Sequence, residues 1–372
     1  MTKQRQVAGP ETAAVIGTGL IGTSIALALR AAGTRVWLTD PDQGAAQLAA
    51  DLGAGELLQP DADLAEPADV AVLAMPPAMV AASLQAAQRR GLARCYTDVA
   101  SVKELPLLGA LELGCDLATY VPGHPMSGRE RSGPAAARAD LFVGRPWVIC
   151  PVAETDPDCV DVVASLIGAC EASVVRMSAA EHDQCVALVS HVPHLVATAV
   201  AVRCADAGER ALSLAGPGLR DVTRIAASDA ALWTEILSAN AGPVREVLLA
   251  VAEQLGTAAD LLADISAGHE ESGKLLTALL ECGREGVASI PGKQGGPAPD
   301  YAIVQVVIGD KPGELARLFA AAGAADINIE DVRIEHSPGL PVGVAELSVR
   351  PQSARRMSAV LADAGWPVAS PA

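Results

Sequence analysis

The sequence predicts an α/β protein of three parts: a Rossmann-type nucleotide domain, an all-α domain and a small βαββαβ domain. Three observations predict it. Short β-like runs alternate with alanine-rich helical stretches at the start of the chain, strand signals then disappear for about a hundred residues, and both signals return after a segment rich in glycine and proline. At 372 residues the chain also exceeds one ordinary core. The predicted bounds are 1–152, 153–288 and 301–372, with 289–300 as a linker.

The first domain is predicted from the alternation of strands and helices. Alternation of this kind is typical of βαβ units, in which helices cover both faces of a parallel sheet. The middle domain is predicted to be helical because its long alanine and leucine stretches carry a helical period. The predicted strands of the first domain are Ala13–Ile16, Arg35–Thr39, Val70–Ala74, Cys95–Asp98 and Trp147–Cys150.

The last segment is predicted to form two βαβ-like halves in the order βαββαβ. This order is the ferredoxin-like arrangement, an antiparallel sheet with two helices on one face. The predicted elements are a strand at Tyr301–Ile308, a helix at Gly313–Ala322, strands at Ile327–Ile334 and Val342–Val349, a helix at Gln352–Ala364 and a short strand at Trp366–Ala369.

The net charge of −17 restricts the partners. Nucleic acids and anionic membranes require a basic face, so the charge argues against both. An anionic small molecule would need a local cationic pocket, which makes individual arginines informative. No continuous apolar segment suits a signal peptide or a membrane span; the best candidate, Val192–Val202, is short. A cytoplasmic protein is expected.

The eight cysteines show neither a CxxC pair nor a zinc-like spacing. We expect them to be small buried hydrophobic residues in a reducing compartment. His191 and His194 flank Pro193 and could suggest metal ligation, but no third ligand recurs nearby, and no metal is expected. His194 alone fits a core or helix-kink histidine.

A glycine-rich turn predicts the cofactor site. Gly17, Gly19 and Gly22 form GxGxxG with Leu20 and Ile21, directly after one predicted strand and at the start of a helix. Such glycines let the backbone approach a pyrophosphate, whose charge interacts favourably with the positive end of the helix. The alternative interpretation is a simple connecting turn.

Asp40 ends the second predicted strand, 18 residues beyond Gly22. A carboxylate there accepts hydrogen bonds from the adenosine ribose and repels a 2′-phosphate, so NAD is favoured over NADP. The alternative is an aspartate that caps the next helix. Met75 and Pro76 close the third strand, where the backbone would pass along the cofactor; a strand-ending proline turn explains them almost as well.

Polar residues follow the predicted strands where a doubly wound sheet forms its crevice. Asp98, Ser101 and Lys103 come after the fourth strand, and His124 lies between Gly123 and Pro125. Neutral imidazole accepts a hydroxyl proton near pH 7, so His124 is the candidate base. A loop histidine bonded to the backbone is the alternative, with even odds from spacing alone.

Four separated stretches, TDVASVK, GHPMSGRERSG, EHDQCVALVSHVPH and DVTRIAASDAALW, together resemble the prephenate/arogenate dehydrogenase family of tyrosine biosynthesis. The resemblance implies a homodimer that uses NAD to convert prephenate to 4-hydroxyphenylpyruvate by oxidative decarboxylation. It implies His124 and Ser101 as catalytic residues, with Ser101 also touching the nicotinamide. It assigns to the substrate Arg224, His191, Glu130, Trp233 and Asp221, the last as the support of the Arg224 guanidinium.

Two residues depart from the family pattern. Arg129 stands where many relatives carry a small residue, and Pro217 lies in a stretch that is usually rich in glycine. Arg129 could bind a second carboxylate and favour prephenate over arogenate, or it could point to solvent. Arogenate or another aminated prephenate analogue therefore stays open as the substrate.

The last domain resembles the ACT family of amino-acid-binding regulatory domains. The resemblance rests on Asp310-Lys311-Pro312-Gly313-Glu314-Leu315 and on Ile327-Asn328-Ile329. It implies an effector site at Asp310, Pro312, Gly313 and Asn328, with tyrosine as the natural ligand. A domain used only for dimerisation is the alternative.

Two other functions are alternatives to a prephenate or arogenate dehydrogenase. A β-hydroxyacid dehydrogenase would need a lysine as proton carrier in the helical domain, but residues 177–268 contain none. A non-catalytic amino-acid sensor that keeps NAD binding would lose only affinity when His124 is replaced by asparagine.

Overall fold

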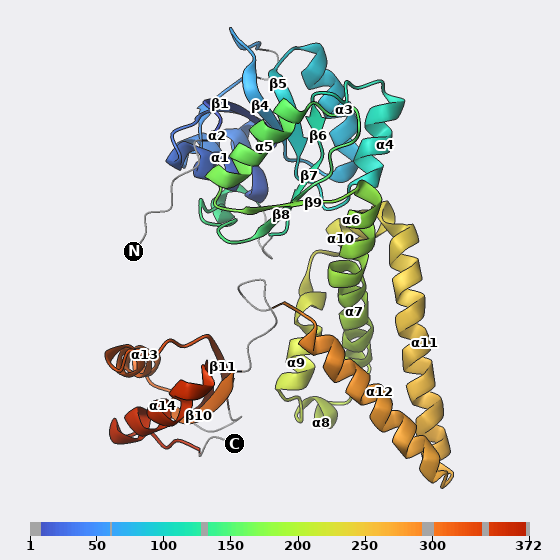
Figure 1. Cartoon of the computed structure of the whole chain (residues 1–372), viewed down its shortest axis with the longest axis vertical. Helices are drawn as coiled ribbons and strands as arrows, with labels where there is room; N and C mark the ends of the chain where they lie inside the picture. Colours follow the sequence, from blue (N-terminus) through green and yellow to red (C-terminus); the bar gives the residue numbers. More distant parts are fainter. Residues whose placement is uncertain (1–8, 60–61, 128–132, 292–300, 337–341, 370–372) are drawn as a thin grey trace. The chain divides into compact units, whose positions relative to one another are not determined.

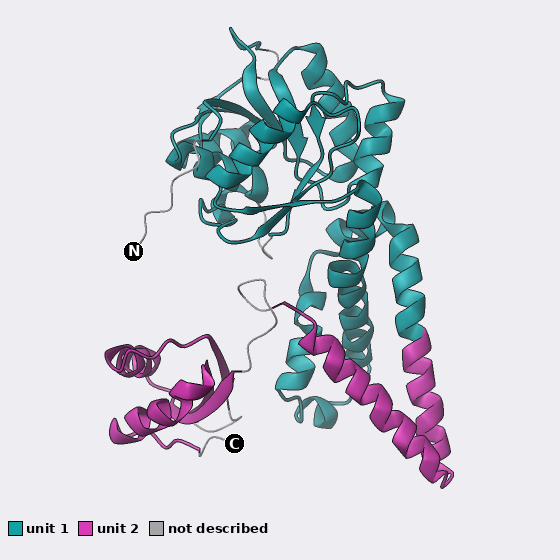
Figure 2. Ribbon diagram, in the orientation of Figure 1, with its two compact units in different colours: residues 1–252 teal, residues 253–372 magenta. Residues whose placement is uncertain are grey.

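The computed structural model describes residues 9–59, 62–127, 133–291, 301–336 and 342–369. It divides into two compact units, Met1–Ala252 and Glu253–Ala372 (Figure 2). Arg129, Glu130 and most of the linker lie outside the described residues.

The first unit begins with a six-stranded sheet in the order β3-β2-β1-β4-β5-β6, and all its strand pairs are parallel (Figure 1). From β1 the strand order first runs to β2 and β3 on one side and then to β4, β5 and β6 on the other. This is the order of a nucleotide-binding Rossmann sheet, as predicted. The strands are β1 (Thr12–Ile16), β2 (Arg35–Thr39), β3 (Glu56–Leu57), β4 (Ala68–Leu73), β5 (Ala93–Asp98) and β6 (Tyr120–Val121).

Helices cover both faces of this sheet. Alternate residues of β1 enter different cores: Ala13 and Val15 pack with α1 and α5, whereas Ala14 packs with α3. The small aliphatic residues let the helices approach closely. The helices are α1 (Leu20–Ala31), α2 (Gln43–Asp51), α3 (Pro77–Arg89), α4 (Glu104–Glu112) and α5 (Pro157–Ala169).

A second, three-stranded sheet carries His124. It has the order β7-β8-β9, comprising Gly123–Pro125, Pro146–Ile149 and Ser173–Arg176, and the 3₁₀ turn η1 (Pro134–Ala136) precedes β8. The predicted strand at Trp147–Cys150 therefore does not join the parallel sheet: β8 pairs antiparallel with β7 instead. Since α5 packs on the first sheet and β9 pairs with β8, the nucleotide domain extends past the predicted boundary at residue 152.

Helices follow, as predicted. They are α6 (Ala179–Val186), the π-helical turn η2 (Ala187–His191), α7 (Val192–Ala205), α8 (Glu209–Leu212), α9 (Pro217–Thr223), the 3₁₀ turn η3 (Arg224–Ala227), α10 (Ala230–Ala239), α11 (Ala241–Ser266) and α12 (Glu270–Ala288). The continuous stretch Ala179–Ala205 is long and apolar enough to cross a membrane by length and composition alone. It nevertheless buries His182, Asp183 and His191, which is typical of a core helix.

The C-terminal sheet has the order β10-β12-β11, comprising Ala302–Gly309, Val342–Val349 and Asp331–His336, and both pairs are antiparallel. Val368 adds an antiparallel bridge to Val306 on the free edge of β10. With α13 (Glu314–Ala324) and α14 (Pro351–Asp363), this reproduces the predicted βαββαβ order. The predicted strand at Ile327–Ile334 starts late, at Asp331.

Two expectations about the cysteines were wrong. Cys185 and Cys282 are exposed, not buried. Cys95 of β5 and Cys159 of α5 form a disulfide, with their Cα atoms 5.4 Å apart. Sequence spacing could not reveal this pair because 64 residues separate the two positions. Cys150 and Cys170 are buried free thiols, as expected, and burial raises the pKa of each to about 12.

Candidate active site

The backbone of the glycine turn packs directly against the backbone at Ala74, just after β4. Gly17 has φ +101°, and a Cβ on it would lie 2.2 Å from the Ala74 carbonyl oxygen; a Cβ on Gly22 would lie 1.9 Å from the Gly17 carbonyl oxygen. Both positions therefore require glycine. Gly19 differs, because a Cβ there would meet nothing within 4 Å. The turn thus combines two packing glycines with one whose backbone faces open space.

The first turn of α1 can receive an anion. Its N-cap, Gly19, supplies no side-chain cap, and no acidic residue lies in that turn, so the amide groups and the helix dipole favour a phosphate. Asp40 lies beside the turn: its Oδ2 accepts from the Thr18 amide at 2.5 Å and from the Thr18 hydroxyl at 3.0 Å. Each carboxylate oxygen has two lone pairs, so Asp40 retains capacity for ribose hydroxyls. These residues fit a dinucleotide.

A buried charge cluster lies at the end of β5. Asp98 and Lys103 are fully buried and form an ion pair. Asp98 also accepts a hydrogen bond from the Tyr120 hydroxyl at 2.6 Å, and Lys103 donates to the Gly123 carbonyl. Burial without pairing would be costly for either charge, so the cluster fixes the backbone just before His124.

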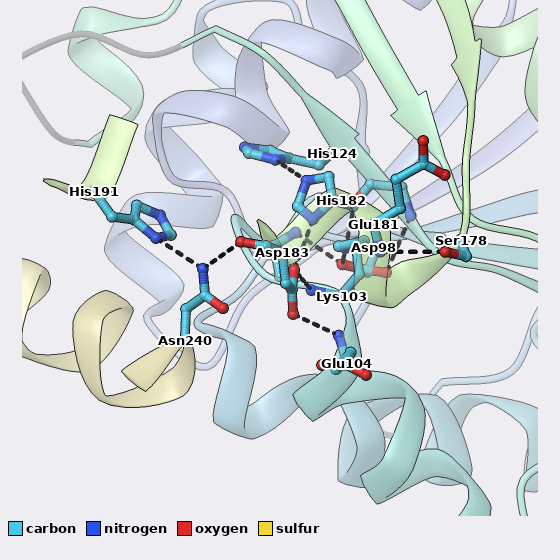
Figure 3. Close-up of polar contacts among 12 residues, drawn as sticks. Asp98, Lys103, Glu104, His124, Ser178, Glu181, His182, Asp183, His191 and Asn240 are labelled. Atoms are coloured by element: carbon cyan, nitrogen blue, oxygen red, sulfur yellow. Dashed lines mark hydrogen bonds and ion pairs between the residues drawn. The ribbon is translucent and has the colours of Figure 1, made fainter. Parts of the chain in front are cut away.

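His124 faces a second histidine (Figure 3). Its Nδ1 lies 2.8 Å from Nε2 of His182, and Nδ1 of His182 lies 2.7 Å from Oδ1 of Asp183. Burial, followed by the charges of His182, Lys103 and His191, holds the pKa of His124 well below its usual value. His124 is therefore a neutral imidazole at pH 7, the form that accepts a proton.

His191 occupies the end of the π-helical turn, a feature found often at functional sites. Its Nδ1 lies 3.0 Å from Nδ2 of Asn240, and the same amide nitrogen donates to the Asp183 carbonyl at 2.8 Å (Figure 3). Because the Asn240 amide donates, Nδ1 of His191 is an acceptor and its Nε2 carries the hydrogen. Burial lowers the pKa of His191 to about 4.

Trp233 of α10 lies against two histidines. Its ring stacks on His194 with centroids 3.6 Å apart, and it meets the His191 ring edge-on at 6.1 Å. His194 is buried, and its Nδ1 has no hydrogen-bond partner among the described atoms. The structure thus brings Trp233 next to His191.

Comparison with known proteins decides the family. The profile described as the prephenate dehydrogenase nucleotide-binding domain matches residues 25–176, and that of the prephenate dehydrogenase dimerization domain matches 178–279. A probable prephenate dehydrogenase of Streptomyces niveus is 39% identical, over 96% of this chain and 99% of the relative. The chain belongs to the prephenate dehydrogenase family.

Other relatives agree. The Bacillus subtilis prephenate dehydrogenase is 28% identical over 87% of this chain and 88% of its own. Among solved structures, Synechocystis arogenate dehydrogenase superposes with a TM-score of 0.63 at 26% identity, covering 74% of this chain and 99% of that one. A dehydrogenase from Corynebacterium glutamicum, named as putative, gives 0.62 at 30% identity, covering 68% and 82%. The protein is thus an NAD-dependent oxidoreductase of the prephenate dehydrogenase family, as predicted.

The remaining predicted site residues of this family member fall into three groups. Ser101 and Met75 are half-buried in the turns after β5 and β4, and Pro76 precedes α3. Asp221 of α9 lines an apolar groove with Leu188 and Val192, and Arg224 begins η3. Arg129 and Glu130 lie outside the described residues, so their roles stay predictions, as does the support of Arg224 by Asp221.

Sequence reasoning placed Lys103 in the crevice without its ion pair to Asp98, and it missed three residues of this site: His182, Asp183 and Asn240. A usable signal existed for two of them, because His182 and Asp183 lie within the quoted stretch EHDQCVALVSHVPH. Asn240 gave none, since it lies 49 residues from the His191 that it contacts.

Proposed function

We propose that this protein is a prephenate dehydrogenase: it oxidises prephenate with NAD and releases carbon dioxide and 4-hydroxyphenylpyruvate. The observation that carries the proposal is the neutral His124, whose imidazole is held by buried partners next to the end of β5, where a Rossmann sheet forms its crevice. The pattern of family matches along the chain supports the same reaction.

NAD, held by the glycine turn and Asp40, would supply the acceptor for a hydride from the hydroxyl-bearing ring carbon. As that hydride leaves, positive charge develops on the hydroxyl group, and His124 holds its proton through Nε2. The carbon–carbon bond to the ring carboxylate then breaks, its electron pair completes the aromatic ring, and carbon dioxide departs. The oxygen takes its proton back as a phenol, so no net proton is released. Ser101 orients the hydroxyl.

The substrate carboxylates need cationic or hydrogen-bonding partners in an acidic protein. We assign Arg224 to one carboxylate, because a guanidinium binds a carboxylate through two parallel hydrogen bonds. His191 presents Nε2–H and can donate to the same anion, and Trp233 forms the apolar wall beside it. Glu130 keeps its assignment to the substrate, and Arg129 is the candidate for the second carboxylate.

Arogenate is the second candidate substrate, favoured by the similarity to the Synechocystis arogenate dehydrogenase structure. The two substrates differ only in a keto or an amino group on the side chain. Steady-state kinetics with each purified substrate, followed by NADH absorbance, tests the proposal. We expect kcat/KM to be at least about tenfold higher with prephenate, since one discriminating polar contact is worth roughly 1.4 kcal/mol or more. A higher value with arogenate would overturn the preference, and no turnover of either would overturn the function.

We also propose that the protein is a homodimer and that the C-terminal domain is an ACT domain that binds tyrosine. The dimerization-domain match and the exposed leucines of the helical segment support the dimer. In the C-terminal domain, Gly313 has φ +85° at the N-terminus of α13, next to Asp310 and Pro312, and Asn328 follows that helix. Tyrosine should lower the activity of the full chain and leave a chain that ends at residue 299 unaffected; equal inhibition of both would overturn the regulatory role.

A further inference from the structure

We propose that His182 and Asp183 act as a positioning pair that fixes the tautomer of His124 and shares the proton it receives. This inference rests on the proposed function, because it concerns the base of that reaction. The geometry points to it: an unbroken row of hydrogen bonds runs from His124 through His182 to Asp183, and every member is held by buried neighbours (Figure 3).

Asp183 determines which atoms in this row donate hydrogen bonds and which accept them. Its Oδ1 accepts from the Lys103 amide at 2.8 Å, and its Oδ2 accepts from the Glu104 amide at 2.9 Å. A carboxylate engaged by two backbone donors acts as an acceptor toward a third group as well. Nδ1 of His182 therefore carries the hydrogen in the 2.7 Å contact with Asp183 Oδ1.

The tautomer of His124 follows from that of His182. A neutral imidazole that donates through Nδ1 has only a lone pair at Nε2. In the 2.8 Å contact between the rings, His124 must then be the donor through Nδ1. This leaves the Nε2 lone pair of His124 free to accept the substrate hydroxyl proton. Without the pair, both tautomers of His124 would be accessible, and one of them cannot accept a proton at Nε2.

The same row stabilises the charged state. When His124 receives a proton at Nε2, its Nδ1 hydrogen can shift toward Nε2 of His182, and Asp183 balances the resulting positive charge. The shift reverses when the phenol oxygen recovers its proton. His182 is fully buried and Asp183 is 1% exposed, so the carboxylate acts with little solvent screening. Burial and the neighbouring His182 oppose charging of His124 itself; passing the proton along the row brings the positive charge next to the Asp183 carboxylate instead.

Asn240 extends the arrangement to the substrate side. Its amide nitrogen bridges the Asp183 carbonyl and Nδ1 of His191, at 2.8 and 3.0 Å. The bridge places His191 and the pair in one hydrogen-bonded frame, although 49 residues separate His191 from Asn240. The histidine that accepts the proton and the histidine that contacts the substrate are thereby positioned together.

Two variants separate the two roles of the pair. Asp183→Leu removes the acceptor of the His182 Nδ1 hydrogen, so neither ring is held in one tautomer and part of the His124 population carries its hydrogen on Nε2. We expect kcat to fall on the order of 10²-fold with KM changed less than about threefold, the lower end of the contribution of a general base. His182→Gln can still accept from His124 and donate to Asp183, so the tautomer persists while the proton has no second ring; we expect a loss of about tenfold. Glu181→Gln, an exposed neighbour on α6, is the control and should match the wild type.

The direct test is ¹⁵N NMR of the histidine rings in the full chain, without substrate. We expect the His124 signals, identified by their loss in His124→Asn, to show a protonated Nδ1 and an unprotonated Nε2, and Asp183→Leu to show both nitrogens partly protonated. A His124 protonated at Nε2 in the wild type, or unchanged in Asp183→Leu, would overturn the inference. So would a fall in kcat explained entirely by a lower melting temperature. This measurement needs no turnover. If the NMR signals agree with the expected tautomers but the wild type does not oxidise prephenate, only the proposed function is contradicted.

Discussion

The strand side and the helix side of the active site differ in how completely one chain builds them. The strand side comprises Asp98 and Lys103 after β5, with His182 and Asp183 of α6 packed against them; all four are buried, and each has hydrogen-bond or ionic partners in place. On the helix side, α8, α9 and α10 bury none of their residues, all of which the structure describes. Leu214 there is 85% exposed, which is unusual for so large an apolar side chain.

The difference indicates which part of the proposed reaction is preorganised. The groups that hold the proton are fixed before any substrate arrives, because their hydrogen bonds are internal. The helices that carry Asp221, Arg224 and Trp233 leave apolar surface exposed, which a second copy of the chain and the substrate can cover. Variants of the strand side should therefore change kcat, and variants of the helix side should change KM or assembly.

The largest effect is expected from His124→Asn. Asparagine cannot accept and return the hydroxyl proton, so we expect kcat to fall about 10³- to 10⁴-fold while NAD binding is unchanged. Stopped-flow or steady-state NADH formation measures the rate. His269→Asn replaces an exposed histidine and serves as the control. Retention of most of the activity by His124→Asn would show that another group acts as the base.

The next effect concerns Arg224. Replacing it with lysine keeps the charge but removes the paired hydrogen bonds to a carboxylate, so we expect KM to rise about 10- to 100-fold with kcat changed much less. Arg220→Lys, an exposed arginine of α9, is the matched control. If kcat fell and KM stayed constant, Arg224 would belong to the chemical step, and the distinction between the two sides would fail.

A smaller effect on activity is expected from the helical surface. Leu255 of α11 is 63% exposed, and Leu255→Glu would place a charge in an interface between two copies. We expect sedimentation to shift from dimer toward monomer at micromolar concentration, with a modest rise in KM. Glu253→Gln is the control. An unchanged sedimentation coefficient would show that this part of α11 lies outside the interface.

The smallest effect is the pH dependence of stability from His191. Its pKa is lowered from 6.5 to about 4 by burial, so the folded chain binds fewer protons than the unfolded chain between these values. The contribution of neutral His191 to the free energy of unfolding is complete above pH 6.5 and is lost as the pH falls toward 4. We expect urea unfolding to show a lower unfolding free energy at pH 4.5 than at pH 7, and a shallower dependence in His191→Gln. Identical dependence in both proteins would contradict the assignment.

Much of the fold could be predicted because the signals were local. The β2 and β12 bounds match the predicted strands, since each is a short β-branched or apolar run between turn residues. Trp147–Ile149 was assigned to the wrong sheet because register depends on the distant partners His124 and Ser173. A composition-based boundary at residue 152 likewise failed to see that α5 packs back on the first sheet.

The site residues likewise divide into those that local sequence patterns identify and those that only contacts between distant segments reveal. His124, Ser101, Arg224 and the glycine turn were identifiable because each lies in a recognisable stretch of residues. The pairing of His124 with His182 joins positions 58 residues apart, and no single-sequence spacing encodes it. The Cys95–Cys159 disulfide was missed for the same reason. Contacts between distant segments are set by packing of the whole domain, which local patterns do not contain.

The most direct test of the central claim follows all three products of the reaction. Prephenate carrying deuterium on its hydroxyl-bearing ring carbon should give one deuterated NADH and one carbon dioxide per molecule consumed, with 4-hydroxyphenylpyruvate as the organic product, and His124→Asn should suppress all three together. NADH formed without carbon dioxide, or unlabelled NADH, would contradict the account.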